Sequence, residues 1–281
     1  MITNNDLDIM YDYYLKLSND PEVDKKRYYV TSNNMKKDEL GNIMNLENQF
    51  YRFMVDYFGF NGFPKVISDE KYNNFNSPEL YHGFVKMSHP SSYLSHWNYH
   101  YGQGYISGFF STDSFKNARK YTVADELSFG YRSKKKVMKL KLNPGKMIKI
   151  DDLEEIASIV NKKRDLEDSI VLKKYPEFIE ELEKLRIYVK IKSQQEKSIK
   201  NTKGFLDLFT FSSILAMYLG IDTVLYKGVY GFDYYIENDR SRVILSQSEA
   251  KRFMENGKNL KDCPVNLICD TEFDIISGAE K

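Results

Sequence analysis

Two segments of the chain, ELYHGF (residues 79–84) and GQGYISGFFSTDSFKNARKY (residues 102–121), carry the features that decide the fold. The first segment predicts a short apolar strand, Leu80–Val85, that contains a histidine–glycine pair. In the second segment, several glycines come first, and a phenylalanine pair and a run of small polar residues come after them. All four histidines and the only tryptophan of the chain lie within or between these segments: His82, His89, His96, His100 and Trp97. Ring side chains and glycines concentrated in this way predict a cleft for a flat, polar ligand.

The end of the second segment predicts a helix. Asp113 or Ser114 can cap it, because their short side chains accept hydrogen bonds from the N–H groups of a first helical turn. Apolar side chains then recur at helical spacing at Phe115, Ala118 and Tyr121.

A later segment, LAMYLGIDTVLYKGVYGFDYYIENDRSRVILS (residues 215–246), completes a recognisable pattern. Together, the blocks resemble the ADP-ribosyltransferase fold, the NAD-binding split sheet of diphtheria-type toxins, poly(ADP-ribose) polymerases and clostridial toxins. They are also similar to ADP-ribosyltransferase-like domains of phage minor head proteins. The resemblance implies an α+β fold with split antiparallel sheets. It further implies a helical lead-in over residues 1–78 and an NAD-binding domain over 79–281, with a helical insertion over 151–203.

The same resemblance implies a set of NAD-binding residues. A histidine on the first strand would hold the ribose or phosphates, and a following glycine would leave the backbone open to the nicotinamide amide. Phe110 takes the place of a tyrosine that stacks on nicotinamide, and a tyrosine one helical step beyond closes the other face of that ring. Neighbouring hydroxyls would position NAD and the catalytic acid. The implied binding residues are His82, Gly83, Phe110, Ser111, Thr112 and Tyr121.

His82 is one candidate catalytic residue, and two further residues are candidates for the position of the catalytic acid. Family transferases carry a glutamate on a late strand, and in DYYIENDRSRVIL (residues 233–245) the best alignment places Tyr234 at that position. The reaction needs a carboxylate to offset positive charge, and this requirement instead favours Glu237. In a regular strand Glu237 shares a face with Asp233 or Tyr235 and not with Tyr234, because successive side chains alternate between faces.

Composition restricts the partners. The 281 residues are 42% hydrophobic, and 41 basic against 40 acidic residues leave a net charge of +1. No general electrostatic field therefore draws the chain to nucleic acid or anionic lipid. Lys134–Lys136 are expected to be the solvated entry to a strand, with a phosphate or nucleic-acid contact as the alternative. No run approaches the roughly 18 apolar residues of a membrane span.

Targeting and metal signals are weak. The sequence predicts no signal peptide and a cytoplasmic product, which could later join a virion or enter a target cell. Cys263 and Cys269 predict reduced thiols rather than a disulfide framework. His96 and His100 have a spacing that zinc can use on a helix, but Pro90 and the absence of an HExxH pattern favour no metal site.

Two functions remain open. The first is a mono-ADP-ribosyltransferase, a toxin or phage-encoded effector, that cleaves NAD at the nicotinamide–ribose bond and modifies a macromolecule, a protein rather than a nucleic acid. The second is a virion-associated or interaction protein that keeps the fold without catalysis. A neutralising or phage-structural partner fits either function.

Periodicity also predicts the regular elements. Amphipathic patterns indicate two early helices, with Ile9, Met10, Tyr13, Tyr14 and Leu17 on the inner side of the first. The predicted helices span residues 5–18, 40–58, two segments within 151–200, 205–220 and 248–255. The predicted strands span residues 137–142, 147–150, 223–226, 234–237 and 242–245.

Overall fold

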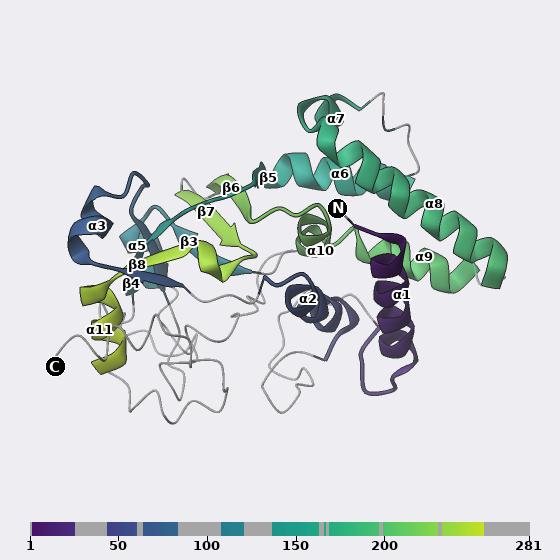
Figure 1. Cartoon of the computed structure of the whole chain (residues 1–281), viewed down its shortest axis with the longest axis horizontal. Coiled ribbons are helices and arrows are strands. Elements are labelled where there is room, and N and C mark those ends of the chain that lie inside the picture. The colour runs from purple at the N-terminus through teal and green to yellow at the C-terminus, as the bar shows by residue number, and fades with distance from the viewer. Residues whose placement is uncertain are drawn as a thin grey trace.

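The structure is a computed structural model that describes residues 2–25, 44–60, 64–83, 108–120, 137–162, 166, 169–196, 199–229 and 232–255. Within these residues ten α-helices accompany an eight-stranded mixed sheet, so the predicted α+β class is confirmed. Figure 1 shows the sheet on one side of the molecule and most of the helices on the other.

The strands are β1 (Lys65–Ile67), β2 (Leu80–Gly83), β3 (Phe109–Thr112), β4 (Val137–Leu142), β5 (Met147–Lys149), β6 (Thr223–Val229), β7 (Phe232–Glu237) and β8 (Val243–Ser246). Their order across the sheet is β1-β8-β4-β2-β3-β7-β6-β5. The inner pairs are antiparallel, as expected, whereas β1 pairs with β8 and β5 with β6 in parallel. The lead-in therefore contributes an edge strand as well as helices.

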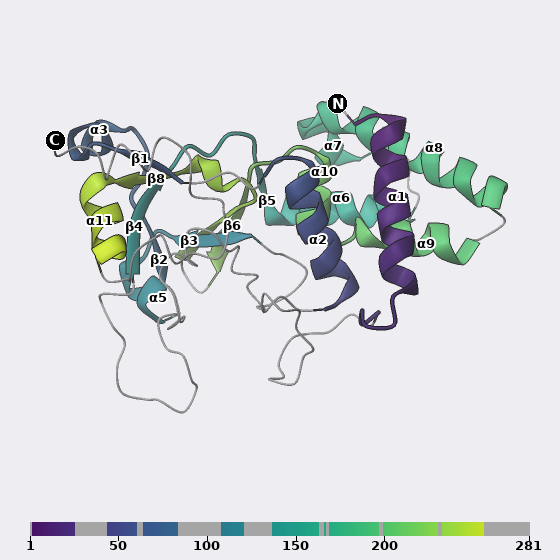
Figure 2. The ribbon, with the colours of Figure 1, turned by 60° about the horizontal axis from the view of Figure 1, so that its bottom comes forward.

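The helices are α1 (Asn4–Asn19), α2 (Leu46–Tyr57), α3 (Asp69–Asn74), α5 (Phe115–Lys120), α6 (Ile150–Lys162), α7 (Ile170–Lys174), α8 (Ile179–Glu196), α9 (Ile199–Leu208), α10 (Ser212–Tyr218) and α11 (Gln247–Glu255). Both ribbon views place α3 and α11 at the β1–β8 end of the sheet, and α1, α2 and α6 to α10 beyond its β5 end (Figures 1 and 2). We call this second group the helical body.

Aromatic side chains fill the core of the helical body. Phe205 of α9 makes edge-to-face contacts with Tyr11 of α1, at 5.2 Å between ring centroids, and with Phe209, at 5.3 Å. Tyr13 of α1 stacks on Phe53 of α2 at 4.1 Å. Such pairs add to the free energy gained by burying the rings. Tyr11 also contacts Tyr188 of α8 edge to face at 6.2 Å, so the N-terminal helices and the insertion share one core.

Several helices differ in detail from the sequence prediction. The buried side of α1 consists of Leu7, Met10, Tyr11, Tyr14 and Leu17, while Ile9 is 37% exposed. Helix α2 begins after its cap Asn45, because the Asn45 side chain accepts the N–H of Asn48 at 2.8 Å. The single helix predicted for 205–220 is two helices, α9 and α10, separated by a turn at residues 209–211.

Candidate functional site

Three neighbouring strands bring the two distant sequence blocks together. Strand β3 lies between β2 and β7 and is antiparallel to both. Tyr81 pairs with Thr112, which places His82 beside Ser111 in the next pair of an antiparallel ladder. On the other side of β3, Phe109 pairs with Glu237. The histidine strand, the Ser-Thr strand and the late strand are thus consecutive in the sheet.

Side-chain alternation divides the candidate residues between the two faces of these strands. One face, here called the histidine face, carries His82, Phe109, Ser111, Tyr235 and Glu237. The opposite face carries Tyr81, Phe110, Thr112, Tyr234 and Ile236. Glu237 is therefore the late-strand candidate on the same face as His82, and Tyr234 is not.

His82 is held in a fixed position. It is 3% exposed, and its ring stacks on Phe109 with centroids 4.3 Å apart and planes at 25°. His82 Nδ1 lies 2.5 Å from the carbonyl oxygen of Phe110. A carbonyl oxygen only accepts, so Nδ1 carries the proton in this contact. The backbone of β3 thus selects the tautomer of an imidazole on β2.

Glu237 is the most deeply buried acid of the site. The side chain is 0% exposed, and its Oε2 lies 2.8 Å from Thr223 Oγ1 on β6. Burial raises the pKa of Glu237 well above its usual value, and the negative charges of Asp222 and Asp239 act in the same direction. In the ionised form, a hydrogen bond donated by Thr223 and the positive charge of Arg242 act in the opposite direction on this pKa.

Polar atoms on the Ser111 and Glu237 side chains of the histidine face have no hydrogen-bond partner among the described residues. They are Ser111 Oγ and Glu237 Oε1, and both residues are at most 2% exposed. Buried polar atoms normally find a partner. Each of these two atoms could therefore accept or donate one further hydrogen bond.

Helix α5 covers the opposite face. Ser114 caps this helix by accepting the N–H of Asn117 at 3.2 Å, which confirms the predicted Ser114 cap. Asn117 then donates its side-chain amide to the hydroxyl of Tyr234. Phe115 meets Tyr81 edge to face at 5.5 Å. The Tyr234 hydroxyl is thus directed at α5 and away from His82.

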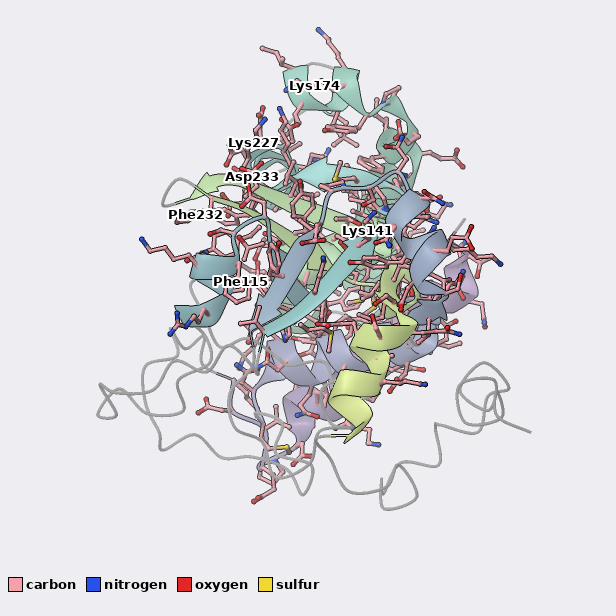
Figure 3. All side chains as sticks on the ribbon, turned by 90° about the vertical axis from the view of Figure 1, so that its left-hand side faces the viewer. Phe115, Lys141, Lys174, Lys227, Phe232 and Asp233 are labelled. Carbon is pink, nitrogen blue, oxygen red and sulfur yellow. The ribbon has the colours of Figure 1, made fainter. Side chains whose placement is uncertain are left out.

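The β6–β7 hairpin ends close to α5. Figure 3 labels Lys227, Phe232 and Asp233 at this end of the hairpin and Phe115 on the neighbouring helix. Asp233 accepts the N–H of Gly228 at 2.9 Å, and its own N–H donates to Asp113 at 3.3 Å. These contacts give Asp233 a structural role in the turn.

No family model, curated protein or solved structure matches the chain. The geometry of the histidine face is therefore the basis for any functional argument.

The structure thus groups the predicted site residues in part. His82, Ser111 and Glu237 share one face, Gly83 follows His82 on β2, and Phe110, Thr112 and Tyr234 lie on the other face. Tyr121, His89, His96, His100, Lys134–Lys136, Cys263 and Cys269 lie outside the described residues. Sequence reasoning missed Phe109 and Thr223. Strand alternation counted back from Ser111 would have found Phe109, whereas no local signal marks Thr223.

The described part of the chain has neither a metal-ligand cluster nor a membrane-spanning helix. There, no group of three or more histidine, cysteine, aspartate or glutamate side chains is arranged to hold a metal ion. Among the same residues no helix combines the length and apolar character needed to cross a membrane.

Proposed function

We propose that the chain is a mono-ADP-ribosyltransferase that cleaves NAD at the nicotinamide–ribose bond on the histidine face. One observation carries the proposal: His82 of β2 and Glu237 of β7, from segments far apart in the sequence, share one face of the sheet, with Phe109 of the intervening strand β3 between them. The resemblance of these segments to ADP-ribosyltransferases supplies the reaction. The acceptor would be a macromolecule, a protein rather than a nucleic acid, as the net charge of +1 favours.

The chemistry needs groups of the kind this face holds. Loss of nicotinamide leaves positive charge on the ribose, so a carboxylate close to that carbon stabilises the transition state more than the ground state. Glu237 would take this role once ionised. His82 would bind the ribose or phosphates of NAD, and the Ser111 hydroxyl offers a further hydrogen bond. Phe109 replaces Phe110 as the ring on the same face as the imidazole.

Nicotinamide release from labelled NAD tests this proposal. We expect E237Q to lower kcat by about 100-fold or more, in line with the loss of other electrostatic groups from active sites. Because Gln is close to Glu in size, E237Q should still bind NAD. H82A should weaken NAD binding. Thermal melting of each variant would show that the fold survives.

Two further variants sharpen the result. E177Q changes an exposed glutamate between α7 and α8, outside the three site strands, and should leave turnover unchanged. Y234F tests the other late-strand candidate, and on this geometry it should keep most of the activity. If wild-type protein neither binds NAD nor releases nicotinamide at high concentration, the proposal is lost. If Y234F lowers kcat as much as E237Q does, the assignment of Glu237 as the catalytic acid is wrong.

A second candidate function is a virion-associated or interaction protein with the same fold and no catalysis. The burial of both central residues favours it, since His82 is 3% and Glu237 0% exposed. It predicts that the chain copurifies with particles or a protein partner, and that H82A and E237Q bind that partner like the wild type. Labelled NAD would then show no saturable binding.

A further inference from the structure

The hydroxyl of Thr223 lies between two other oxygen atoms in the interior of the protein. Thr223 Oγ1 is 2.6 Å from the carbonyl oxygen of Pro144 and 2.8 Å from Oε2 of Glu237. Both separations are those of hydrogen bonds between oxygen atoms. Thr223 and Glu237 are both 0% exposed. The protons in these two contacts must therefore come from the three groups themselves.

The number of available protons decides how the three groups are bonded. A carbonyl oxygen can only accept, and a threonine hydroxyl has a single proton to donate. Two oxygen acceptors 2.6 Å apart with no proton between them repel each other, so the hydroxyl proton belongs to the contact with Pro144. We propose that Thr223 donates to Pro144 and accepts from a protonated Glu237. Thr223 is then a positioning residue that holds Glu237 as a neutral carboxylic acid.

The surrounding backbone prevents Pro144 from moving away. The Lys146 carbonyl accepts the N–H groups of both Asp222, at 2.9 Å, and Thr223, at 3.2 Å. Gly145 adopts φ +57°, and a Cβ at that position would lie 2.1 Å from Asp222 Oδ2. Only glycine allows the turn to lie this close to the start of β6. The Pro144 carbonyl is thus held against the Thr223 hydroxyl.

The nearby charges also favour a neutral Glu237. The one cation that lowers its pKa, Arg242, is shared between Asp222, at 3.3 Å, and Asp239, at 3.6 Å. Two aspartates thus already balance a single guanidinium. Lys146, in the turn, directs its ammonium to the Leu219 carbonyl at 3.3 Å. Burial without a free counter-charge keeps a carboxyl protonated.

This arrangement predicts how the proposed reaction depends on pH, and this step rests on the proposed function. A neutral Glu237 cannot offset positive charge on the ribose, so the proton on Oε2 must leave first. Nicotinamide release should rise with pH until Glu237 is ionised. The proton on Glu237 can be located by a measurement that does not depend on enzymatic activity.

Infrared difference spectroscopy of the purified full-length chain locates that proton. The wild-type minus E237Q spectrum at neutral pH should contain the C=O band of a protonated carboxyl, with its shift in D2O. A carboxylate band in its place would overturn the proposal. The same spectra recorded across pH give the pKa of Glu237.

Thr223 variants then test the direction of the hydrogen bond. If Thr223 accepts from the acid, T223V removes a bond that stabilises the protonated form, so the pKa of Glu237 falls and T223S restores it. If Thr223 instead donates to a carboxylate, T223V raises that pKa, and the proposal is overturned. If Thr223 had a purely structural role, T223V would lower the stability of the protein and leave the pKa of Glu237 unchanged, which would also overturn the proposal.

A stability measurement covers the case in which T223V does not fold. An unfolded glutamate ionises near pH 4.3, whereas folded Glu237 keeps its proton to higher pH. Between these two pKa values the unfolded chain releases a proton that the folded chain retains. The folding equilibrium constant of the wild type, relative to E237Q, should then fall by up to about tenfold per pH unit as pH rises. A ratio that is constant from pH 5 to 8 would overturn the proposal even if no NAD reaction exists.

Discussion

Lys141 is a buried cation that, among the described residues, is stabilised by carbonyl groups and has no carboxylate in direct contact. It is 8% exposed, and its Nζ donates to the carbonyl oxygens of Tyr72 and Phe75, each at 2.8 Å. These carbonyls end helix α3, where the helix dipole favours positive charge. The same Nζ lies 5.0 Å from the centre of the Tyr72 ring. Figure 3 labels Lys141 among the side chains near α3.

We predict that K141M destabilises the protein by about 1–3 kcal/mol, because two buried carbonyl groups lose a charged donor. K139M, two residues away on the same strand, is the matched control. Lys139 is half-exposed and pairs with Glu79 at the surface, so its loss should cost less than about 1 kcal/mol. Denaturant unfolding measures both values. Equal effects of the two variants would contradict the role assigned to Lys141.

At the residue level, sequence reasoning succeeded where the cause is local. Ser114 was recognisable as a cap because a capping side chain bonds within its own helical turn. The choice of Phe109 over Phe110 was also accessible, because local strand alternation places Phe109 on the same face as Ser111. The Thr223 contact was inaccessible because its partner Pro144 comes from a distant turn.

At the scale of an element, helix α1 again shows that features with a local cause were predicted and that features set by distant residues were not. Its span was predicted to within a residue at each end, and Thr3 and Asp6 form the capping box that begins it. The buried side was predicted less well. Packing on α2, α8 and α9 buries a side centred on Leu7, Tyr11 and Tyr14 and leaves Ile9 at the edge. Neighbours from elsewhere in the chain decide which of several apolar residues faces inward.

Two alanine variants of α1 test this orientation. L7A removes a side chain that is 0% exposed and should cost about 2–5 kcal/mol. I9A removes a side chain that is 37% exposed and should cost less than about 1 kcal/mol. Thermal and denaturant unfolding provide the comparison. A larger loss for I9A would mean that the helix faces its neighbours as the sequence alone suggested.

At the scale of the whole molecule, the lead-in and the insertion are not separate additions to a core. Tyr188 of α8 donates to Asp8 of α1 at 2.7 Å, and Lys192 pairs with the same carboxylate at 2.9 Å. Tyr11 donates to Glu196 at 2.8 Å. Every strand except β1 was predicted from the local sequence, but this assembly joins segments far apart in sequence, which local patterns do not specify.

We therefore predict that a fragment of residues 79–281 does not fold like the intact chain. Without α1 and α2, the apolar surfaces of α8, α9 and α10 would be exposed to water. Circular dichroism should show a broad, low-temperature transition, and adding residues 1–78 as a second polypeptide should restore a sharp one. A fragment that melts like the full-length protein would establish residues 79–281 as an independent domain.

The parallel pairing of β1 with β8 has a consequence for synthesis on the ribosome. Residues 65–67 find their partner only after residues 243–246 have been made. Until then, the far edge of the sheet stays incomplete while α1 and α2 already await the insertion. Contacts over such long sequence distances slow folding. The nascent chain should therefore need chaperone protection until β8 has been made.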